Sequence, residues 1–291
     1  MEVTRIGAFQ LGWGESLVYD ERRDRLYFVD CAASTLHWLD GGEGELRTLR
    51  LPSMAAGLVP TEGGGLVGAL DDGLHEIDPD AGTSRLLSPY PDGLGGRAND
   101  ACADLSGNIV TGTLNLEPGP GSLWWFSPRQ GWRMLDAGIS NTNGPNVAVE
   151  EGVTTLYVGD TGADYYRYRY DGGAGAVGDR ELFGDVTALA GAPDGTAVDD
   201  EGGLWCALVG GRQLARFTDA GLDRTVALPV ANPTDVAFGG PDLDRLYVVS
   251  IGLGAADDAL DGALLRIDGV GARGRPEPRV ALSPPGDVTN R

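Results

Sequence analysis

The chain has 291 residues, enough for one large domain or two small ones, and its 42% hydrophobic content is ordinary for a globular protein. Its 22 basic residues against 43 acidic ones leave a formal net charge of −21, which repels nucleic acids and anionic membranes and attracts cations. Every basic residue is arginine, so Schiff-base chemistry through an enzyme lysine and a lysine-containing phosphate loop are both excluded.

Short β-branched and aromatic runs recur along the chain between glycine- and proline-rich turns. In chain order, the first strand of each repeat is predicted at residues 16–20, 56–60, 101–105, 146–150, 196–200 and 234–238. The second strand is predicted at residues 24–30, 64–70, 107–114, 154–160, 202–208 and 244–250. The third is predicted at residues 34–40, 72–78, 121–127, 164–171, 212–218 and 262–268. A fourth, more polar strand follows at residues such as 44–51 and 222–229.

A repeat of roughly 38 to 50 residues with four strands is typical of a propeller blade. The sequence therefore predicts an all-β protein, a six-bladed β-propeller that forms a single domain over residues 1–291. The last unit lacks a convincing fourth strand. We expect residues 3–9 to supply it, which closes the ring and avoids an exposed sheet edge.

The sequence gives no sign of a membrane or secretory segment. No stretch approaches the ~20 apolar residues that a membrane span needs, and residues 1–16 lack a basic region followed by an apolar one. We therefore expect a cytoplasmic protein with neither a membrane nor a nucleic acid as partner. The two histidines, His37 and His75, lie far from the motifs discussed below, which leaves little room for a Ser-His-Asp triad.

The residues that enter the innermost strands of a propeller gather at one mouth of its central channel. Glu15, Asn99 and Asp194 each stand five residues before an acidic turn residue that ends such a strand. Equal spacing predicts equal heights on separate blades, so these side chains should converge on the axis. Asn143 precedes another innermost strand and can join them.

Carboxylate and amide oxygens are hard ligands suited to a divalent cation, and two carboxylates would neutralise its charge. The sequence thus predicts a central-channel metal site with one divalent ion. Ca²⁺ is expected, with Mg²⁺, Mn²⁺ or Zn²⁺ as alternatives. Three protein ligands leave coordination positions open for water or substrate, as in a catalytic metal site.

Four ordered segments resemble the signature segments of the SMP-30/gluconolactonase (regucalcin-like) family. They are residues 14–30, 96–114, 143–160 and 193–221, and residues 233–250 extend the likeness towards the C-terminus. The resemblance implies a six-bladed propeller with a divalent metal in its channel and, most often, hydrolysis of sugar lactones.

The resemblance also implies roles for particular residues. The metal ligands would be Glu15, Asn143 and Asp194. Substrate contacts would come from Arg97, Asn99 and Glu117.

The amide ligand has competitors, because the chain has two asparagines where relatives often have one before the glycine. Asn141 is the first alternative to Asn143, and Asn146 is a weaker one. We favour Asn143 because Gly144 follows it.

The predicted activity is metal-dependent opening of a sugar lactone to the aldonic acid. Asp194 would be both ligand and proton acceptor, with Glu117 as the substitute base. One alternative is a phosphotriesterase resembling diisopropylfluorophosphatase, and another is a calcium-binding propeller without turnover. The sequence does not indicate the oligomeric state.

Overall fold

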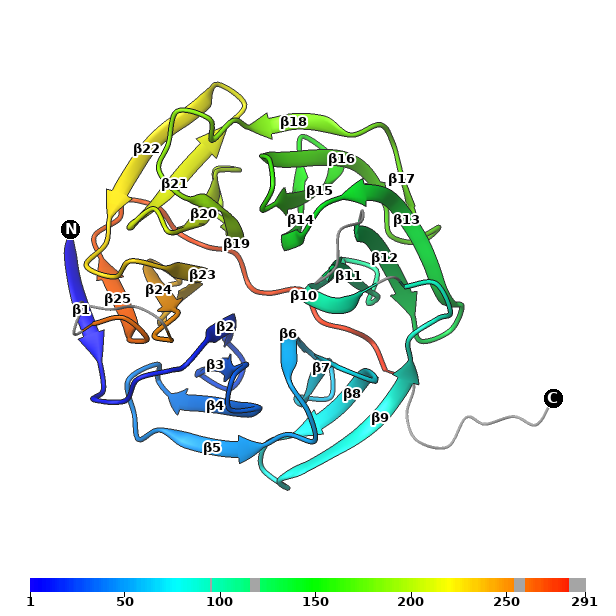
Figure 1. The fold of residues 1–291 in the computed structure, drawn as a ribbon, viewed down its shortest axis with the longest axis horizontal. Helices are drawn as coiled ribbons and strands as arrows, with labels where there is room; N and C mark the ends of the chain where they lie inside the picture. The colour runs from blue at the N-terminus through cyan, green and yellow to red at the C-terminus, as the bar shows by residue number, and fades with distance from the viewer. Residues whose placement is uncertain (95, 116–120, 254–259, 283–291) are drawn as a thin grey trace.

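The computed structural model describes residues 1–94, 96–115, 121–253 and 260–282. Within these residues the strands form six antiparallel sheets around a common axis (Figure 1). The predicted all-β, six-bladed β-propeller is confirmed. Among the same residues, no helix is long and apolar enough to cross a membrane.

The blades follow one another in chain order. Blade 1 consists of β2 (Gly14–Asp20), β3 (Arg25–Asp30), β4 (Thr35–Asp40) and β5 (Arg47–Arg50). Blade 2 consists of β6 (Ala55–Pro60), β7 (Leu66–Leu70), β8 (Gly73–Asp78) and β9 (Thr83–Pro89). Blade 3 consists of β10 (Arg97–Ala103), β11 (Ile109–Leu114), β12 (Gly121–Ser127) and β13 (Gly131–Ile139). Blade 4 consists of β14 (Thr142–Glu150), β15 (Val153–Asp160), β16 (Tyr165–Asp171), β17 (Ala176–Val177) and β18 (Glu181–Gly184). Blade 5 consists of β19 (Ala192–Val198), β20 (Leu204–Val209), β21 (Gln213–Thr218) and β22 (Gly221–Ala227).

Blade 6 is shared between the two ends of the sequence. It consists of β23 (Pro233–Gly239), β24 (Arg245–Ser250), β25 (Leu264–Asp268) and β1 (Glu2–Ile6). β1 lies antiparallel to β25, with Val3 opposite Ile267. The prediction that the N-terminal segment supplies the missing outer strand is therefore confirmed: β1 covers the edge of β25 and completes a four-stranded blade.

The hydrophobic core lies between neighbouring blades. Between blades 1 and 2, for example, Tyr27 and Leu36 belong to one buried cluster with Leu58 and Ile77. The alternating apolar residues of each strand supply these contacts, because successive side chains point to opposite faces of a sheet. The blades thus bury both faces and hold the channel-lining strands in place.

Three buried aspartates end innermost strands in the same way. Oδ1 of Asp20, Asp104 and Asp199 accepts hydrogen bonds from main-chain N–H groups of the turn that follows, with the shortest distances 3.0, 2.8 and 2.7 Å respectively. The three aspartates thus act as turn residues, as expected. They mark equivalent positions along the channel axis at the C-terminal ends of β2, β10 and β19.

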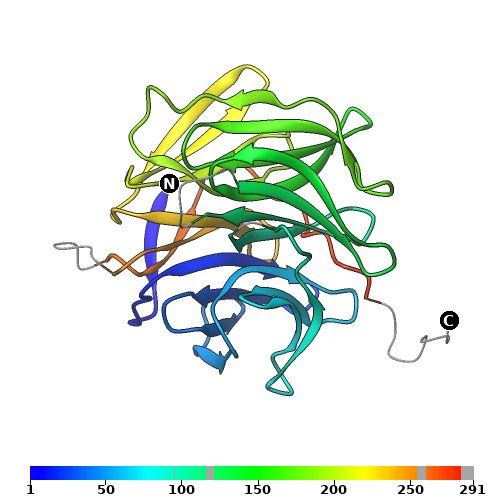
Figure 2. The ribbon, with the colours of Figure 1, turned by 45° about the vertical axis from the view of Figure 1, so that its right-hand side comes forward.

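A segment near the C-terminus, residues 273–281, runs across the propeller axis on the side of these turns (Figure 1, red; Figure 2). We call it the C-terminal strap. It is held at one end by the hydrogen bond from Asp200 N to Arg273 O (2.7 Å) and at the other by that from Val280 N to Pro60 O (2.9 Å). Arg279 also forms a buried ion pair with Asp20 at 2.6 Å. The strap covers this end of the channel.

The innermost strands are longer at their N-terminal ends than predicted. β10, β14 and β19 each begin four residues before the positions expected from the sequence, at Arg97, Thr142 and Ala192. The predicted site residues therefore lie within the strands and not in the loops before them. The apolar alternation breaks at this point for a structural reason described next.

Candidate functional site

Each innermost strand carries a β-bulge near the end of the channel opposite the strap. The register shifts lie at Glu15/Val18 in β2, Ala55/Gly57 in β6, Asn99/Ala101 in β10, Asn143/Asn146 in β14, Pro193/Thr196 in β19 and Pro233/Asp235 in β23. A bulge leaves a residue unpaired and re-aims a side chain, and bulges are common beside active sites. Bulges at one height thus bring polar side chains from separate blades to the same mouth.

The three predicted metal ligands lie at these bulges. Asn143 in β14 and Asp194 in β19 are 6% and 5% exposed, and Glu15 in β2 is partly buried. Burial, followed by the negative charge of Glu15, raises the pKa of Asp194 well above its ordinary value. The two carboxylates, which come from blades 1 and 5, are therefore close enough to repel each other.

Glu15 is held by groups at the channel mouth. The indole Nε1 of Trp13 donates a hydrogen bond to Glu15 Oε1 at 3.0 Å. The guanidinium carbon of Arg97 lies 5.5 Å from the centre of the Trp13 ring, a cation–π contact. Burial and the nearby charge of Asp100 raise the pKa of Glu15 to about 8, against the opposing effects of Trp13 and Arg97.

The side chain of Asn143 is fixed at both ends. Its Oδ1 accepts a hydrogen bond from Asn99 Nδ2 at 2.6 Å, and its Nδ2 donates to Thr161 Oγ1 at 2.6 Å. Thr161 in turn donates to the main-chain oxygen of Pro193 at 2.9 Å. An amide oxygen has two lone pairs, so Asn143 Oδ1 retains one for a cation.

The two competing asparagines have different surroundings. Asn141 precedes β14; its Nδ2 donates to Thr161 Oγ1 at 3.3 Å, and its buried Oδ1 has no hydrogen-bond partner. Asn146 lies on the other side of the bulge and donates to Thr196 O at 3.3 Å. Only Asn143, of the three, stands at the bulge height shared with Glu15.

The main chain of Asp194 is anchored by a tyrosine from the neighbouring blade. The hydroxyl of Tyr165 accepts a hydrogen bond from Asp194 N at 2.8 Å and donates to Ala207 O at 2.9 Å. Tyr165 is fully buried, so this anchor is rigid. Tyr165 thus engages the main chain of Asp194 and not its carboxylate.

The structure describes two of the three predicted substrate residues. Arg97 and Asn99 both lie in β10, Arg97 partly exposed and Asn99 9% exposed. Arg97 is brought beside Glu15, as its effect on the pKa of that carboxyl indicates. Glu117 lies outside the described residues.

Two further carboxylates at the site were not singled out from the sequence. Asp100 and Asp235 are 8% and 6% exposed. Burial raises the pKa of Asp100 to about 6, and burial with the charge of Asp100 raises that of Asp235 well above its ordinary value. Asp100 directly follows Asn99 but stands four residues before Asp104, so the five-residue spacing that selected Asn99 passes over it. Asp235 stands in the corresponding segment of blade 6, where a Pro-Thr-Asp sequence is typical of a turn.

The donors at the mouth suit a hard divalent cation. In the described part of the chain, no three His, Cys, Asp or Glu side chains gather into a metal-binding group, so two carboxylates here would need other oxygen donors, such as an amide, to complete a site. Glu15, Asn143 and Asp194 provide that mixed oxygen set. The carboxylates have raised pKa values because they are buried beside one another, and a cation would relieve their repulsion.

The family model described as "SMP-30/Gluconolactonase/LRE-like region" matches residues 13–252. The chain belongs to this family. The match spans all the innermost strands and therefore the whole of the channel mouth.

Relatives over most of the chain include lactone hydrolases. The chain is 32% identical over 290 residues to a pentonolactonase of Haloferax volcanii, covering 95% of this chain and 97% of that protein. It is 32% identical over 243 residues to a 6-deoxy-6-sulfogluconolactonase of Pseudomonas putida, covering 81% and 82%. Its fold is similar to the crystal structure of the calcium-binding protein regucalcin from Agrobacterium tumefaciens, with TM-score 0.86, 29% identity and coverage of 96% and 97%.

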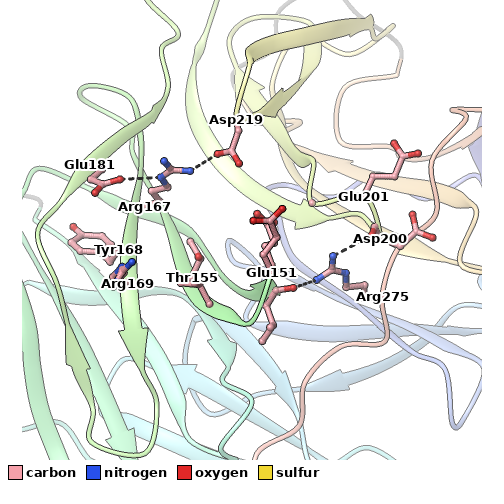
Figure 3. A pocket seen from close by; sticks show the side chains of 14 residues that line it. Glu151, Thr155, Arg167, Tyr168, Arg169, Glu181, Asp200, Glu201, Asp219 and Arg275 are labelled. Carbon is pink, nitrogen blue, oxygen red and sulfur yellow. Dashed lines mark hydrogen bonds and ion pairs between the residues drawn. The ribbon is translucent and has the colours of Figure 1, made fainter.

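This SMP-30/gluconolactonase family member also has a groove between blades 4 and 5, away from the channel mouth. This groove has a volume of about 580 Å³ and is lined by charged side chains from the strap side of the propeller (Figure 3). Arg167 forms ion pairs there with Glu181 and Asp219, and Arg275 donates to the main-chain oxygens of Val149 and Asp200. Arg167 and Arg275 are thus engaged by the protein itself.

Proposed function

We propose that the chain, acting as a single propeller domain, hydrolyses sugar lactones to aldonic acids with the help of a divalent cation. The observation that carries this proposal is the convergence of buried Asp194, partly buried Glu15 and the fixed Asn143 amide at one mouth of the channel. The named activities of the pentonolactonase and sulfogluconolactonase relatives support the substrate class.

Glu15, Asn143 and Asp194 would hold the cation through oxygen atoms. Ca²⁺ is the ion we propose first, because hard oxygen donors with no nitrogen or sulfur suit it, and a regucalcin relative is described as calcium-binding. When bound, a divalent ion would polarise the lactone carbonyl and make water more acidic.

Asp194 would accept the proton of the attacking water. A bound cation lowers the basicity of a carboxylate that it touches, whereas the burial of Asp194 and the charge of Glu15 act in the opposite direction and help it to keep enough basicity for this role. The water oxygen forms a bond to the carbonyl carbon, the ring C–O bond breaks, and the released alkoxide oxygen takes up the proton. The product is the open-chain hydroxy acid.

Arg97 and Asn99 would recognise the hydroxyl groups of the substrate. The Arg97 guanidinium is partly exposed at the mouth, and its stacking on Trp13 restricts its position. Its N–H fork is suited to hydroxyl and carbonyl oxygens. Glu117, which lies outside the described residues, is proposed as a further substrate contact.

Turnover of five- and six-carbon sugar lactones, an alkyl lactone and a phosphotriester, measured before and after removal of metal with a chelator, tests the proposal. We expect sugar lactones to be the best substrates, loss of activity on chelation, and recovery when Ca²⁺ is returned. Asp194→Ala should lose both bound metal and turnover. A full equivalent of metal in Asp194→Ala with intact activity, or faster hydrolysis of the phosphotriester, would overturn it.

A further inference from the structure

Asp100 and Asp235 each bind the main chain of the next blade. Asp235 Oδ2 in blade 6 accepts a hydrogen bond from Leu17 N in blade 1 at 2.6 Å. Asp100 Oδ2 in blade 3 accepts one from Gly144 N in blade 4 at 2.7 Å. The first bond joins residues 218 positions apart and the second joins residues 44 positions apart, and each links two separate sheets. The two carboxylates thus connect neighbouring blades at the height of the bulges.

The N–H groups they bind are the ones that the bulges release. Leu17 lies between Glu15 and Val18, and Gly144 lies between Asn143 and Asn146, where the pairing registers shift. An N–H group that has lost its strand partner and is buried needs another acceptor. A carboxylate from the adjacent blade supplies it in both cases.

These bonds lie directly beside the proposed metal ligands. Leu17 is two residues after Glu15, and Gly144 immediately follows Asn143. Asp235 also packs on the residue after Asp194: a Cβ atom added to Gly195 would lie 1.9 Å from Asp235 Oδ1. One carboxylate therefore touches the main chain next to two ligands from different blades.

Binding these main-chain N–H groups with a buried carboxylate carries a cost in free energy. Asp100 and Asp235 are both more than nine-tenths buried and stand near Glu15, whose charge contributes to the raised pKa of Asp235. A neutral hydroxyl or amide oxygen would accept the same hydrogen bond without the repulsion. A negative charge at these positions is useful if a cation sits at the mouth.

We infer that Asp100 and Asp235 are positioning residues for the metal: they fix the main chain that carries Glu15, Asn143 and Asp194, and their charges strengthen cation binding from beyond the ligand shell. This inference rests on the metal site of the proposed function. Outer-shell partners of metal ligands typically change metal affinity by about 10- to 100-fold when they are replaced. The effect should appear in the affinity for the ion itself.

Calorimetric titration of the metal-free protein with Ca²⁺ tests this. In Asp235→Asn and Asp100→Asn, which keep the side-chain shape, we expect the dissociation constant to rise about 10-fold or more. Asp104→Asn is the matched control, because Asp104 is equally buried and binds main-chain N–H groups at the strap end of β10. It should lower thermal stability and leave the Ca²⁺ affinity within twofold of wild type.

The outcomes separate this inference from the proposed function. If Glu15→Gln abolishes Ca²⁺ binding while Asp235→Asn and Asp100→Asn keep the wild-type constant, the metal site stands and the positioning role is wrong. If the wild-type protein binds no divalent ion, the proposed function itself fails.

Amide hydrogen exchange in the wild-type protein gives an independent check if a variant does not fold. The Leu17 and Gly144 amides should be protected without metal and exchange more slowly still with Ca²⁺. Exchange of these two amides at the rate of exposed turn amides, unchanged by Ca²⁺, would contradict the inference.

Discussion

Asn99 Nδ2 lies 2.6 Å from Asn143 Oδ1 and donates a hydrogen bond to it, which fixes the amide of the proposed ligand from the neighbouring blade. Asn99 also donates to the main-chain oxygen of Thr142 at 3.0 Å. A residue that the family resemblance assigns to substrate thus also orients the proposed metal ligand Asn143.

Asn99→Ala should therefore affect metal and substrate together. Without the donor, the Asn143 amide is held only by its hydrogen bond to Thr161, and we expect the Ca²⁺ dissociation constant to rise about 10-fold, as for other outer-shell changes. Titration calorimetry measures this, and steady-state kinetics at saturating Ca²⁺ measures the remaining effect on KM. An unchanged Ca²⁺ constant would show that the hydrogen bond does not orient the ligand.

The choice of amide ligand is decided by comparing Asn143→Ala with Asn141→Ala. Loss of the true ligand should weaken Ca²⁺ binding by more than the other replacement does. We expect Asn143→Ala to have the larger effect, because Asn143 stands at the bulge height of Glu15. The reverse order would assign the ligand to Asn141, whose buried Oδ1 has no partner within the protein.

Arg97→Ala should separate substrate recognition from metal binding. A substrate hydroxyl left without its partner costs roughly 1 to 3 kcal/mol, so kcat/KM for sugar lactones should fall about 10-fold or more. The metal content, measured by elemental analysis, should stay at the wild-type value. Arg97→Lys is the matched control for charge; it should recover less than full activity, because an ammonium lacks the planar fork. An equal loss of activity on an alkyl lactone would argue against hydroxyl recognition.

The metal-free protein should become less stable as the pH rises. The pKa of Glu15 is about 8 in the folded protein, above its ordinary value of 4.5, so the folded state holds more protons than the unfolded state between these values. Its contribution to stability is complete below about pH 4.5 and is lost as the pH rises through 8. Asp194 shifts in the same direction.

Thermal unfolding with a chelator at pH 6.5 and pH 8.5 measures this effect. The melting temperature should fall between the two, and Ca²⁺ at pH 8.5 should restore it because binding favours the ionised carboxylates. Glu15→Gln is the control, since its side chain does not titrate, and its fall should be smaller. A melting temperature that rises with pH in the metal-free wild type would contradict the prediction.

The sequence predicted the fold well because propeller strands repeat with strong period-two alternation. It also predicted one level for Glu15, Asn99 and Asp194, because each stands five residues before an acidic turn residue, and it added Asn143 because that residue precedes another innermost strand. All four residues lie at register shifts. Alternation is a local signal, and such shifts interrupt it.

The sequence missed what depends on contacts between blades. The bulges interrupt the alternation, so β10, β14 and β19 were predicted to begin four residues too late. Asp235 was overlooked because its partner, the N–H of Leu17, is 218 residues away, and a Pro-Thr-Asp segment taken alone is typical of a turn. A spacing pattern within one blade cannot indicate a contact between two blades, such as that between Asp235 and Leu17.

The pairing of β1 with β25 has a consequence for how the protein is made. Residues 2–6 are synthesised long before their partner strand, residues 264–268. β1 must therefore stay unpaired while the other blades emerge from the ribosome, and the ring can close only after residue 268 has emerged. The entropic cost of closing so long a loop is only slightly greater than that of closing a shorter one, because this cost grows with the logarithm of the loop length. What the arrangement imposes is delay: until the ribosome has released the segment around residue 268, β1 has no partner strand and can pair with any other strand in its surroundings.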